Sequence, residues 1–315
     1  MSRVAVTSRS FSKHPELRSE LLKKYRDTTF NDSDRSLRGS DLIEFLKGHD
    51  SAITALEPMD EKVFAAVPEL RVISKYGVGL DMVDISAMKN RGIRLGWAGG
   101  VNKRAVSELV IAMAISLLRH VPHASNELRK GRWHQHKGRQ LSDRIVGIIG
   151  CGNVGKDLAV LVKAFGCKVF AYDIRNYELF YSEHHIEAAD LTTLLRESDI
   201  VSLHLPLNNT TCGIIGPNEL SLMRKDAVLI NCARGNLVDE VALKSALENG
   251  NLAAAGFDVF STEPPEVSGL LNLPNFLATP HIGGSTEEAI LTMGRAAISG
   301  LETATIPDPL NCMGI

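Results

Sequence analysis

Three residues have side chains suited to handling a small carboxylic acid: Arg234, Glu263 and His281. A guanidinium holds a carboxylate through two parallel hydrogen bonds, and an imidazole moves a proton near neutral pH. A carboxylate beside that imidazole would orient the ring and favour its protonated form. Taken singly, these residues are more simply a surface cation, a turn residue and a loop histidine. Each, however, ends or follows an apolar strand-like run, and the runs are Ala227–Asn231, Ala253–Val259 and Phe276–Thr279. Because doubly wound folds bind ligands at the carboxyl ends of their strands, we predict that the three form one site.

A glycine-rich run predicts a second function for the same part of the chain. The run, Gly150-Cys151-Gly152-Asn153-Val154-Gly155, follows the strand-like Ile145–Ile149 and precedes the helical stretch Lys156–Phe165. In such a position the first glycine permits a tight turn, the second lets a pyrophosphate approach the backbone, and the third lets the helix pack on the strand. The helix N-terminus then offers free N–H groups to the phosphates. An ordinary strand-to-helix turn is the alternative interpretation.

Asp173 favours the dinucleotide interpretation. It closes the next strand-like run, Lys168–Tyr172, and stands 18 residues after Gly155. A carboxylate there can accept hydrogen bonds from an adenosine ribose and would repel a ribose 2′-phosphate. We therefore predict NAD rather than NADP as the cofactor. Arg175, two residues further on, leaves NADP as the alternative.

The elements that must position these residues alternate between strands and helices. Such alternation predicts an α/β fold with two Rossmann-like or flavodoxin-like domains, each a doubly wound parallel sheet. In the first part of the chain the predicted strands are Val4–Thr7, Ala52–Leu56, Leu70–Tyr76 and Ile93–Trp97. In the second part they are Ile145–Ile149, Lys168–Tyr172, Ile200–Leu205 and the three runs named above. A long helix is expected from Asn102 to Arg119 and a surface connection over Arg129–Arg144, while a final helix is expected over Thr286–Leu301.

Length and composition limit the classes of protein to which the chain can belong. With 315 residues, the chain is long enough for about two domains. Its formal net charge of −2 gives no global attraction to nucleic acid or to an anionic membrane. The five cysteines include no C-x-x-C pair, so we expect neither a disulfide framework nor a metal site. We expect a cytoplasmic protein, because no signal peptide or membrane span is evident.

The ordered motifs resemble those of the D-isomer-specific 2-hydroxyacid dehydrogenases, and among them the phosphoglycerate dehydrogenase-like members. The resemblance covers nearly the whole chain. It is carried by the runs Lys75–Asp81, Asn102–Glu108, Gly150–Gly155, His204–Leu207, Asn231–Gly235, Glu263–Pro265 and Pro280–Gly284.

The resemblance implies a function and a role for each site residue. It implies an NAD-dependent oxidoreductase that interconverts a 2-oxo acid and a D-2-hydroxy acid by hydride transfer, with His281 as the acid and base. Arg234, Glu263 and His281 would be the catalytic residues. A substrate-binding loop is implied at Tyr76, Gly77, Val78 and Gly79, where the last two would lend backbone N–H groups to the substrate carboxylate. Cofactor contacts are implied at Gly150, Gly152, Asn153, Val154, Gly155, Asp173, His204, Pro206, Thr211, Cys232, Ala233, Asp258 and Gly283. For His204 and Cys232 a packing role is equally consistent with the sequence.

The resemblance also implies a discontinuous domain arrangement and a partner. Residues 1–100 and 284–315 would form the substrate-binding domain, and residues 101–283 the NAD-binding Rossmann domain inserted into it. A homodimer would be held largely through the long helix after Asn102.

Several alternatives stay open. The substrate is phosphoglycerate or a smaller acid of the hydroxypyruvate or glyoxylate type. The stretch Ala52–Pro58 has no basic residue to bind a phosphate, and Lys75, Arg71, Lys103 or Arg104 would have to compensate. An NADH-sensing, corepressor-like protein without significant turnover is a rival from another class. Formate dehydrogenase-like chemistry is disfavoured, since Glu263 is a carboxylate where an uncharged partner of the histidine would be expected.

Overall fold

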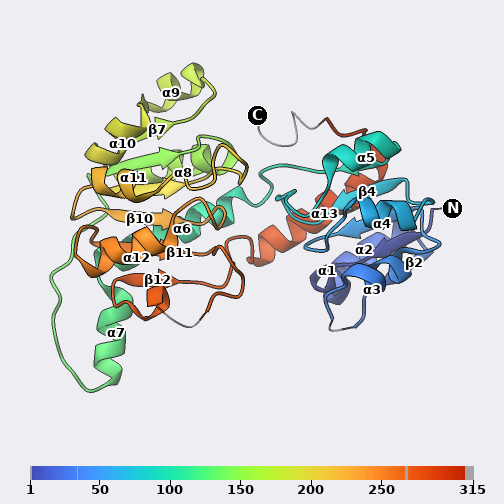
Figure 1. Cartoon of the computed structure of the whole chain (residues 1–315), viewed down its shortest axis with the longest axis horizontal. Coiled ribbons are helices and arrows are strands. Elements are labelled where there is room, and N and C mark those ends of the chain that lie inside the picture. Colours follow the sequence, from blue (N-terminus) through green and yellow to red (C-terminus); the bar gives the residue numbers. More distant parts are fainter. Residues whose placement is uncertain (1, 34, 267–268, 309–315) are drawn as a thin grey trace. The chain divides into compact units, whose positions relative to one another are not determined.

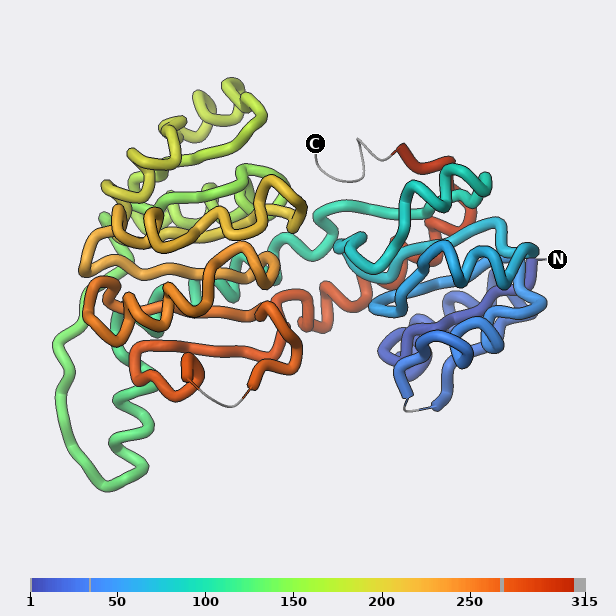
Figure 2. The backbone as a smooth tube through the Cα atoms, viewed as in Figure 1, coloured from blue at the N-terminus to red at the C-terminus, as the bar shows by residue number. Residues whose placement is uncertain are grey.

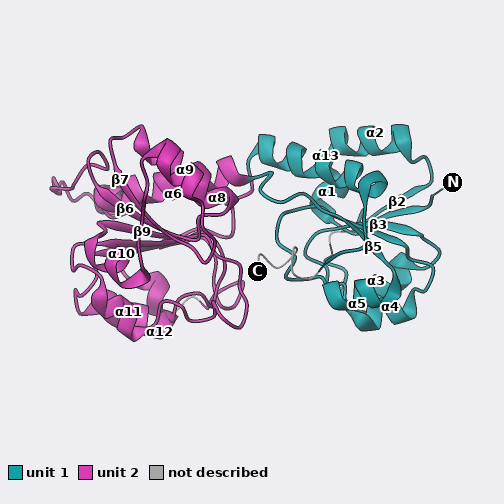
Figure 3. Cartoon of the chain, turned by 90° about the horizontal axis from the view of Figure 1, so that it is seen from above, with its two compact units in different colours: residues 1–102, 286–315 teal, residues 103–285 magenta. Residues whose placement is uncertain are grey.

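The computed structural model describes residues 2–33, 35–266 and 269–308. The chain forms two compact units, coloured separately in Figure 3. Unit 1 comprises residues 1–102 and 286–315, and unit 2 comprises residues 103–285. Unit 1 is therefore built from both ends of the chain.

Unit 1 is a five-stranded parallel sheet with helices on both faces. Its strand order is β2-β1-β3-β4-β5. The strands are β1 (Val4–Val6), β2 (Thr28–Phe30), β3 (Ser51–Thr54), β4 (Val72–Lys75) and β5 (Arg94–Gly96). The helices on one face are α1 (Arg9–Lys13), α2 (Pro15–Lys24) and α13 (Glu287–Thr303), and those on the other are α3 (Gly39–Leu46), α4 (Glu61–Ala66) and α5 (Ile85–Arg91).

Unit 2 is a seven-stranded parallel sheet of order β12-β11-β10-β9-β6-β7-β8. The strands are β6 (Ile145–Ile149), β7 (Lys168–Tyr172), β8 (Glu187–Ala188), β9 (Ile200–Leu203), β10 (Val228–Asn231), β11 (Ala254–Phe257) and β12 (Phe276–Ala278). The helices are α6 (Lys103–Leu118), α7 (Val121–Arg129), α8 (Asn153–Lys163), α9 (Glu178–His184), α10 (Leu191–Glu197), α11 (Pro217–Leu222), α12 (Glu240–Glu248) and a 3₁₀ turn at Gly269–Asn272. The first and second strands of this unit, β6 and β7, pair with each other, and β6 also pairs with β9. The strand order therefore reverses beside β6, and such a reversal is where doubly wound sheets bind ligands.

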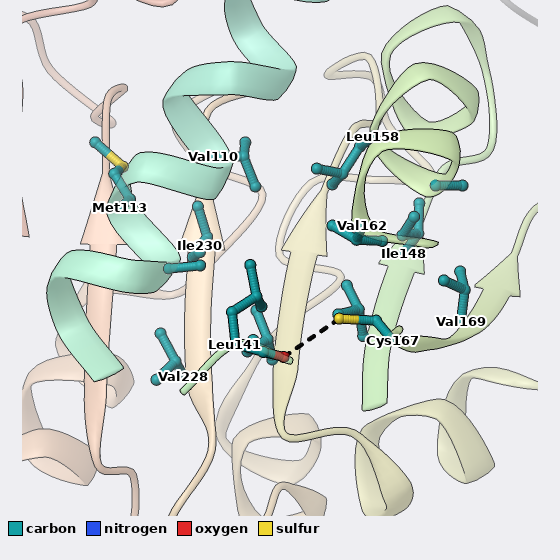
Figure 4. Packing of buried hydrophobic residues seen from close by; sticks show 14 of the residues in the cluster. Val110, Met113, Leu141, Ile148, Leu158, Val162, Cys167, Val169, Val228 and Ile230 are labelled. Carbon is teal, nitrogen blue, oxygen red and sulfur yellow. Dashed lines mark hydrogen bonds between the residues drawn. The ribbon is translucent and has the colours of Figure 1, made fainter. Parts of the chain in front are cut away.

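The core of unit 2 shows why these strands form a parallel sheet. Strands β9, β10 and β11 are buried along their whole length, as expected for strands that helices cover on both faces. One layer packs α6 and α8 against the sheet, and Figure 4 shows Val110, Leu158, Val162 and Ile230 in this layer. The Cys167 thiol donates a hydrogen bond to the Leu141 carbonyl at 3.3 Å, which fixes the approach to β6.

The α/β fold class predicted from the sequence is confirmed, with three differences. The short strands β2 and β8 were not expected. A further helix, α7, follows α6 directly and was also not expected. Pro122 lies in its first turn. Proline is tolerated there, since the first N–H groups of a helix have no intrahelical partner.

Helix α7 and the chain that follows it form an arm, defined here as residues 120–143. Figures 1 and 2 show the arm extending from the sheet of unit 2 before the chain returns to β6. Helix α7 has no buried residue, and Leu128 and Trp133 are 56% and 80% exposed. Among the described residues, no single helix is long and apolar enough to cross a membrane, although α6 and α7, bent by 60°, pass that test as a pair.

Candidate active site

The glycine-rich run follows the central strand β6 and enters α8, and its first and third glycines have a steric reason for their identity. Gly150 has a φ of +95°, and a Cβ there would lie 2.6 Å from the His204 carbonyl oxygen. A Cβ on Gly155 would collide with the Gly150 carbonyl oxygen. In contrast, a Cβ on Gly152 would meet nothing within 4 Å. The space above Gly152 is therefore open, as a site for a pyrophosphate requires.

The N-terminus of α8 fits an anionic ligand. Gly152 is the N-cap, and no side chain caps the first N–H groups of this 11-residue helix. Asn153 and Val154 form its first turn. Uncapped N–H groups and the positive end of the helix dipole together favour a phosphate.

Asp173 lies directly after β7, beside the glycine-rich run. Its Oδ2 accepts a hydrogen bond from the Cys151 N–H at 2.6 Å, and its Oδ1 accepts one from the Arg175 N–H at 2.8 Å. The carboxylate is thus held next to the loop by backbone donors. Burial raises the pKa of the neighbouring Cys151 thiol to about 11, so this cysteine is neutral at physiological pH.

The strand ends β9 and β10 place other predicted cofactor residues. His204 is partly buried, its Nε2 lies 2.9 Å from the Ser202 hydroxyl, and burial lowers its pKa to about 3. Thr211 donates to the Pro206 carbonyl at 2.7 Å and so closes the loop after β9. Cys232 is buried against Met113 of α6, with 3.7 Å between the two sulfur atoms, which is the packing role weighed above. The cofactor contacts of these residues stay predictions.

Glu263 and His281 meet after β11 and β12. The His281 Nδ1 lies 2.8 Å from the Glu263 Oε2, and the other carboxylate oxygen accepts from the Phe260 N–H at 3.1 Å. Because an ionised carboxylate only accepts hydrogen bonds, Nδ1 carries the proton in this pair. Nε2 is then the ring nitrogen left to exchange a proton with a ligand. Both side chains are partly exposed, at 47% for His281 and 39% for Glu263.

Asp258 fixes the loop that carries His281. Its Oδ1 accepts from the Ile282 N–H at 2.8 Å and from the Thr279 hydroxyl, and its Oδ2 accepts from the Gly283 N–H at 2.7 Å. The Asp258 carbonyl also accepts from the His281 N–H at 2.9 Å. The buried carboxylate is therefore engaged in holding this loop, and its predicted contact with the cofactor stays a prediction.

Arg234 follows β10 on a loop that packs against the Glu263 loop. A Cβ on Gly235 would collide with the Phe260 carbonyl, so the two loops touch at that glycine. The loop is shaped by Asn231, whose side chain donates to the Arg234 carbonyl at 2.8 Å and accepts from the Ala233 N–H at 3.1 Å. The predicted catalytic residues thus follow three adjacent strands of one parallel sheet, β10, β11 and β12.

In unit 1, the predicted substrate-binding loop follows β4. Tyr76 is buried, and its ring packs edge-on against Phe11 with centroids 5.4 Å apart. Gly77 has a φ of +123°, which turns the chain into Val78. The Val78 carbonyl accepts from the Trp97 indole N–H at 2.9 Å. Trp97 supports the substrate-binding loop and Asn231 supports the Arg234 loop, and neither residue was singled out from the sequence. Each is an aromatic or polar side chain at the end of an apolar strand, and that pattern was the signal that could have found them.

Lys75 lies at the end of β4, where its ammonium group donates to the Ala55 carbonyl. The side chain is buried, with 4% exposed, and its Nζ lies 3.7 Å from the position of a Cβ on Gly77. Lys75 therefore reaches the stretch 52–58, which has no basic residue of its own. Arg104 instead pairs with Asp157 in unit 2 at 2.9 Å.

The fold and these sites define an α/β protein with a dinucleotide-binding loop and an imidazole–carboxylate pair at the carboxyl edge of the same sheet. The family model for the NAD binding domain of D-isomer specific 2-hydroxyacid dehydrogenases matches residues 111–283. Hydroxypyruvate reductase of Thermotoga maritima is 38% identical over 237 residues, which are 74% of this chain and 76% of that protein. D-3-phosphoglycerate dehydrogenase of Methanocaldococcus jannaschii is 35% identical over 257 residues, and the match spans 80% of this chain but 49% of that protein.

A solved structure agrees with the sequence relatives. The crystal structure of a D-isomer specific 2-hydroxyacid dehydrogenase from Polaromonas sp. JS6 66 superposes with a TM-score of 0.88 at 28% identity and covers 96% of both chains. The chain belongs to the D-isomer specific 2-hydroxyacid dehydrogenase family. It is thus an NAD-dependent oxidoreductase of that family, and its cofactor is NAD.

Proposed function

We propose that this chain interconverts a small 2-oxo acid and the corresponding D-2-hydroxy acid, with His281 as the acid and base. The observation that carries the proposal is the 2.8 Å hydrogen bond between the His281 Nδ1 and the Glu263 carboxylate. That bond orients the ring and leaves Nε2 for proton exchange. The D stereochemistry rests on the family resemblance.

Different residues of unit 2 would bind the cofactor, transfer the proton and bind the substrate carboxylate. The glycine-rich loop, the N-terminus of α8 and Asp173 would hold NAD, and the bound nicotinamide supplies or accepts the hydride. His281 would donate a proton to the carbonyl oxygen of the 2-oxo acid in reduction and remove it from the hydroxyl in oxidation. Arg234 would bind the substrate carboxylate and stabilise the negative charge that develops on the carbonyl oxygen. Glu263 would keep the imidazole oriented.

The proposed cofactor preference is for NAD over NADP. The Asp173 carboxylate is fixed beside the loop by two backbone donors, so it cannot readily turn away from a ribose. A 2′-phosphate there would face a fixed negative charge. A kcat/KM with NADPH tenfold above that with NADH would contradict this preference.

The proposed substrates are acids of the glyoxylate or hydroxypyruvate type, with phosphoglycerate as the second candidate. The substrate-binding loop of unit 1 would contribute the Val78 and Gly79 N–H groups to the substrate carboxylate. Lys75 supports a polar or anionic substituent on the substrate, because its ammonium group lies where the stretch 52–58 lacks a cation.

The test is a spectrophotometric panel of 2-oxo acids and D-2-hydroxy acids, run with both nicotinamide cofactors. We expect NADH oxidation with at least one 2-oxo acid. In His281→Gln we expect kcat to fall by about 10²–10⁴-fold while NADH affinity changes little, because general acid catalysis has that typical value. Tight NADH binding without turnover across the panel would instead support the NADH-sensing alternative. Near wild-type turnover in His281→Gln would refute the role of His281 without touching the family assignment.

We also propose a cytoplasmic homodimer. The four cysteines of the described chain, Cys151, Cys167, Cys212 and Cys232, are unpaired, which suits a reducing compartment, and Cys312 lies outside the described residues. The dimer would be held largely through α6, the long helix after Asn102, and the exposed apolar residues Val121, Leu128 and Trp133 of the arm would add partner contacts. Light scattering should give twice the chain mass, and Leu128→Ser with Trp133→Ser should shift it toward one chain mass.

A further inference from the structure

Four histidines gather where the arm leaves the body of unit 2. His120 precedes α7 in a left-handed conformation with a φ of 56°, and His123 lies in the first turn of α7. His134 and His136 lie in the extended segment after that helix. The ring centroid of His136 lies 4.4 Å from that of His134, 4.9 Å from that of His123 and 5.9 Å from that of His120. One imidazole is therefore enclosed by three others, and we call these four residues the histidine cluster.

The surroundings of His136 provide almost no compensating charge. A cavity of about 280 Å³ adjoins the cluster, and its other lining residues are uncharged: Ser116 and Leu117 of α6, Pro122, and Ala253, Ala254, Pro274, Asn275, Phe276 and Leu277. Glu127 of α7 is an acidic group that acts on His136, but Glu127 forms an ion pair with Arg132. His136 Nε2 is buried and has no hydrogen-bond partner among the described residues.

This arrangement suits a neutral imidazole and opposes a charged one. Burial lowers the pKa of His136, and the neighbouring His134, His123 and His120 lower it further, while Glu127 acts in the opposite direction. Neutral imidazoles pack edge to face, as His134 and His123 do against His136. Protonated imidazoles at these separations would repel one another. In the described chain no group of three His, Cys, Asp or Glu side chains is placed to hold a metal ion.

We propose that the histidine cluster is a proton-sensitive latch on the arm. Neutral imidazoles hold the returning segment, residues 132–138, against α7, and acidification releases that segment. The sign follows from linkage. If His136 titrates normally once the segment is released, the released state binds more protons below about pH 6.5, so the latched state loses stability as the pH falls through that value. This device lies outside the proposed chemistry at His281 and does not depend on it.

The test combines two measurements on the full chain between pH 5 and pH 8. Proton–carbon NMR of the histidine rings follows the protonation of His136, assigned by its loss in His136→Phe. Hydrogen exchange with mass spectrometry, corrected for the intrinsic rate at each pH, follows the protection of residues 130–140. We expect His136 to titrate below pH 6.5, and protection to fall at least tenfold over the same range. Light scattering at each pH separates release within one chain from dissociation of a dimer.

Variants decide whether the cluster is responsible. His136→Phe keeps a ring that cannot be charged, so we expect protection to persist to lower pH. His184→Phe is the matched control, because His184 packs against Phe180 of α9, outside the cluster, and the wild-type pH dependence should remain. The latch is refuted if protection in the wild type does not change with pH, or if His136→Phe keeps the wild-type profile. If His136→Phe does not fold, the wild-type titration still decides, since a His136 that titrates at or above pH 6.5 overturns the proposal.

Discussion

The Glu263 carboxylate has two oxygens, and each has a different partner. One oxygen accepts from the Phe260 N–H, which fixes the carboxylate on its own loop, and the other accepts from the His281 ring. The backbone of the loop after β11 therefore orients the imidazole through the Glu263 carboxylate. Asp258 plays the matching part for the backbone of the His281 loop, because it accepts from Ile282 and Gly283. Two acidic residues therefore hold one histidine from opposite ends.

Replacing Glu263 with glutamine should separate orientation from charge. An amide oxygen can still accept from the Nδ1–H, but the negative charge of the carboxylate is lost. We expect kcat for reduction to fall about 10²-fold, within the usual range for disturbed acid–base catalysis. Stopped-flow rates of NADH oxidation measure this fall. Glu266→Gln, an exposed neighbour on the same loop, is the control, and an equal effect in it would contradict the role of Glu263.

His204 should make stability depend on pH. Its pKa is about 3 in the folded chain because desolvation of the ring disfavours the charged form, and it returns to about 6.5 on unfolding. Between these values the unfolded chain holds one more proton, so the free energy of unfolding decreases as the pH is lowered from about 6.5. Removing one such group flattens the slope by up to about 1.4 kcal/mol per pH unit. Urea unfolding of His204→Gln at pH 5–8 should show this flattening, whereas His184→Gln should keep the wild-type slope.

At the scale of elements, the strand–loop–helix unit β6, loop and α8 combines two kinds of glycine. Gly155 is required by folding, since a Cβ there would collide with the Gly150 carbonyl. Gly152 is not required by packing, because a Cβ there would meet nothing. The same motif therefore contains one position set by the fold and another set by the ligand.

The two glycines should respond differently to alanine. In Gly152→Ala we expect the free energy of unfolding to change by less than about 0.5 kcal/mol, as at uncrowded sites. NADH affinity should nevertheless fall about tenfold or more, because the methyl group occupies the space where the pyrophosphate approaches. In Gly155→Ala we expect a loss of about 1–3 kcal/mol in stability from overpacking. Calorimetric titration with NADH and urea unfolding give both quantities, and unchanged NADH affinity in a folded Gly152→Ala would contradict the assignment of this loop.

How far the sequence predicted these elements depended on how strong their pattern was. Strand β7 lies where it was expected, since Lys168–Tyr172 is a short, mostly apolar run between two turn signals. Strand β2 was missed because Thr28–Phe30 is short and only partly buried, so its partner β1 and not its own composition stabilises it. Helix α7 was missed because a proline after a helix usually signals an end. The same proline also suits the first turn of a new helix, and only the tertiary structure decides between the two.

The candidate active site also contains features that the sequence predicted and features that it did not. The sequence placed Arg234, Glu263 and His281 after three strands, and the parallel sheet brings those strand ends to one edge. The engagement of Asp258 with the His281 loop had no sequence signal, because a lone aspartate after a strand looks the same whether it binds a ligand or the backbone. The histidine cluster was equally hidden, since its members come from a helix and an extended segment that only the arm brings together.

At the scale of the whole molecule, unit 2 is continuous in sequence and unit 1 is not. Unit 2 has its own core on both faces of its sheet, formed by residues 103–285 alone. Unit 1 depends on α13, which packs on β4 so closely that a Cβ on Gly300 would collide with the Ser74 hydroxyl. Unit 2 therefore has a complete core within residues 103–285, whereas the N-terminal part of unit 1 needs α13 to complete its core.

A fragment of residues 103–285 should fold and bind NADH without catalysing turnover. Its sheet, its glycine-rich loop and Asp173 are complete, whereas the substrate-binding loop at Tyr76–Gly79 is missing. We expect a cooperative thermal transition, and an NADH affinity within about tenfold of that of the full chain. The control is residues 1–102 alone, which lack α13 and should give no cooperative transition. A fragment of unit 2 that folds but does not bind NADH would contradict the placement of the cofactor site.

The return of α13 to unit 1 also sets an order for biogenesis. During translation the strands of unit 1 leave the ribosome before unit 2, yet α13, which lies with α1 and α2 on one face of their sheet, is made only after unit 2. Unit 2 can fold while the strands of unit 1 still expose the apolar surface that α13 later covers. Chaperones that bind nascent chains should therefore be retained on the first hundred residues until α13 has left the ribosome.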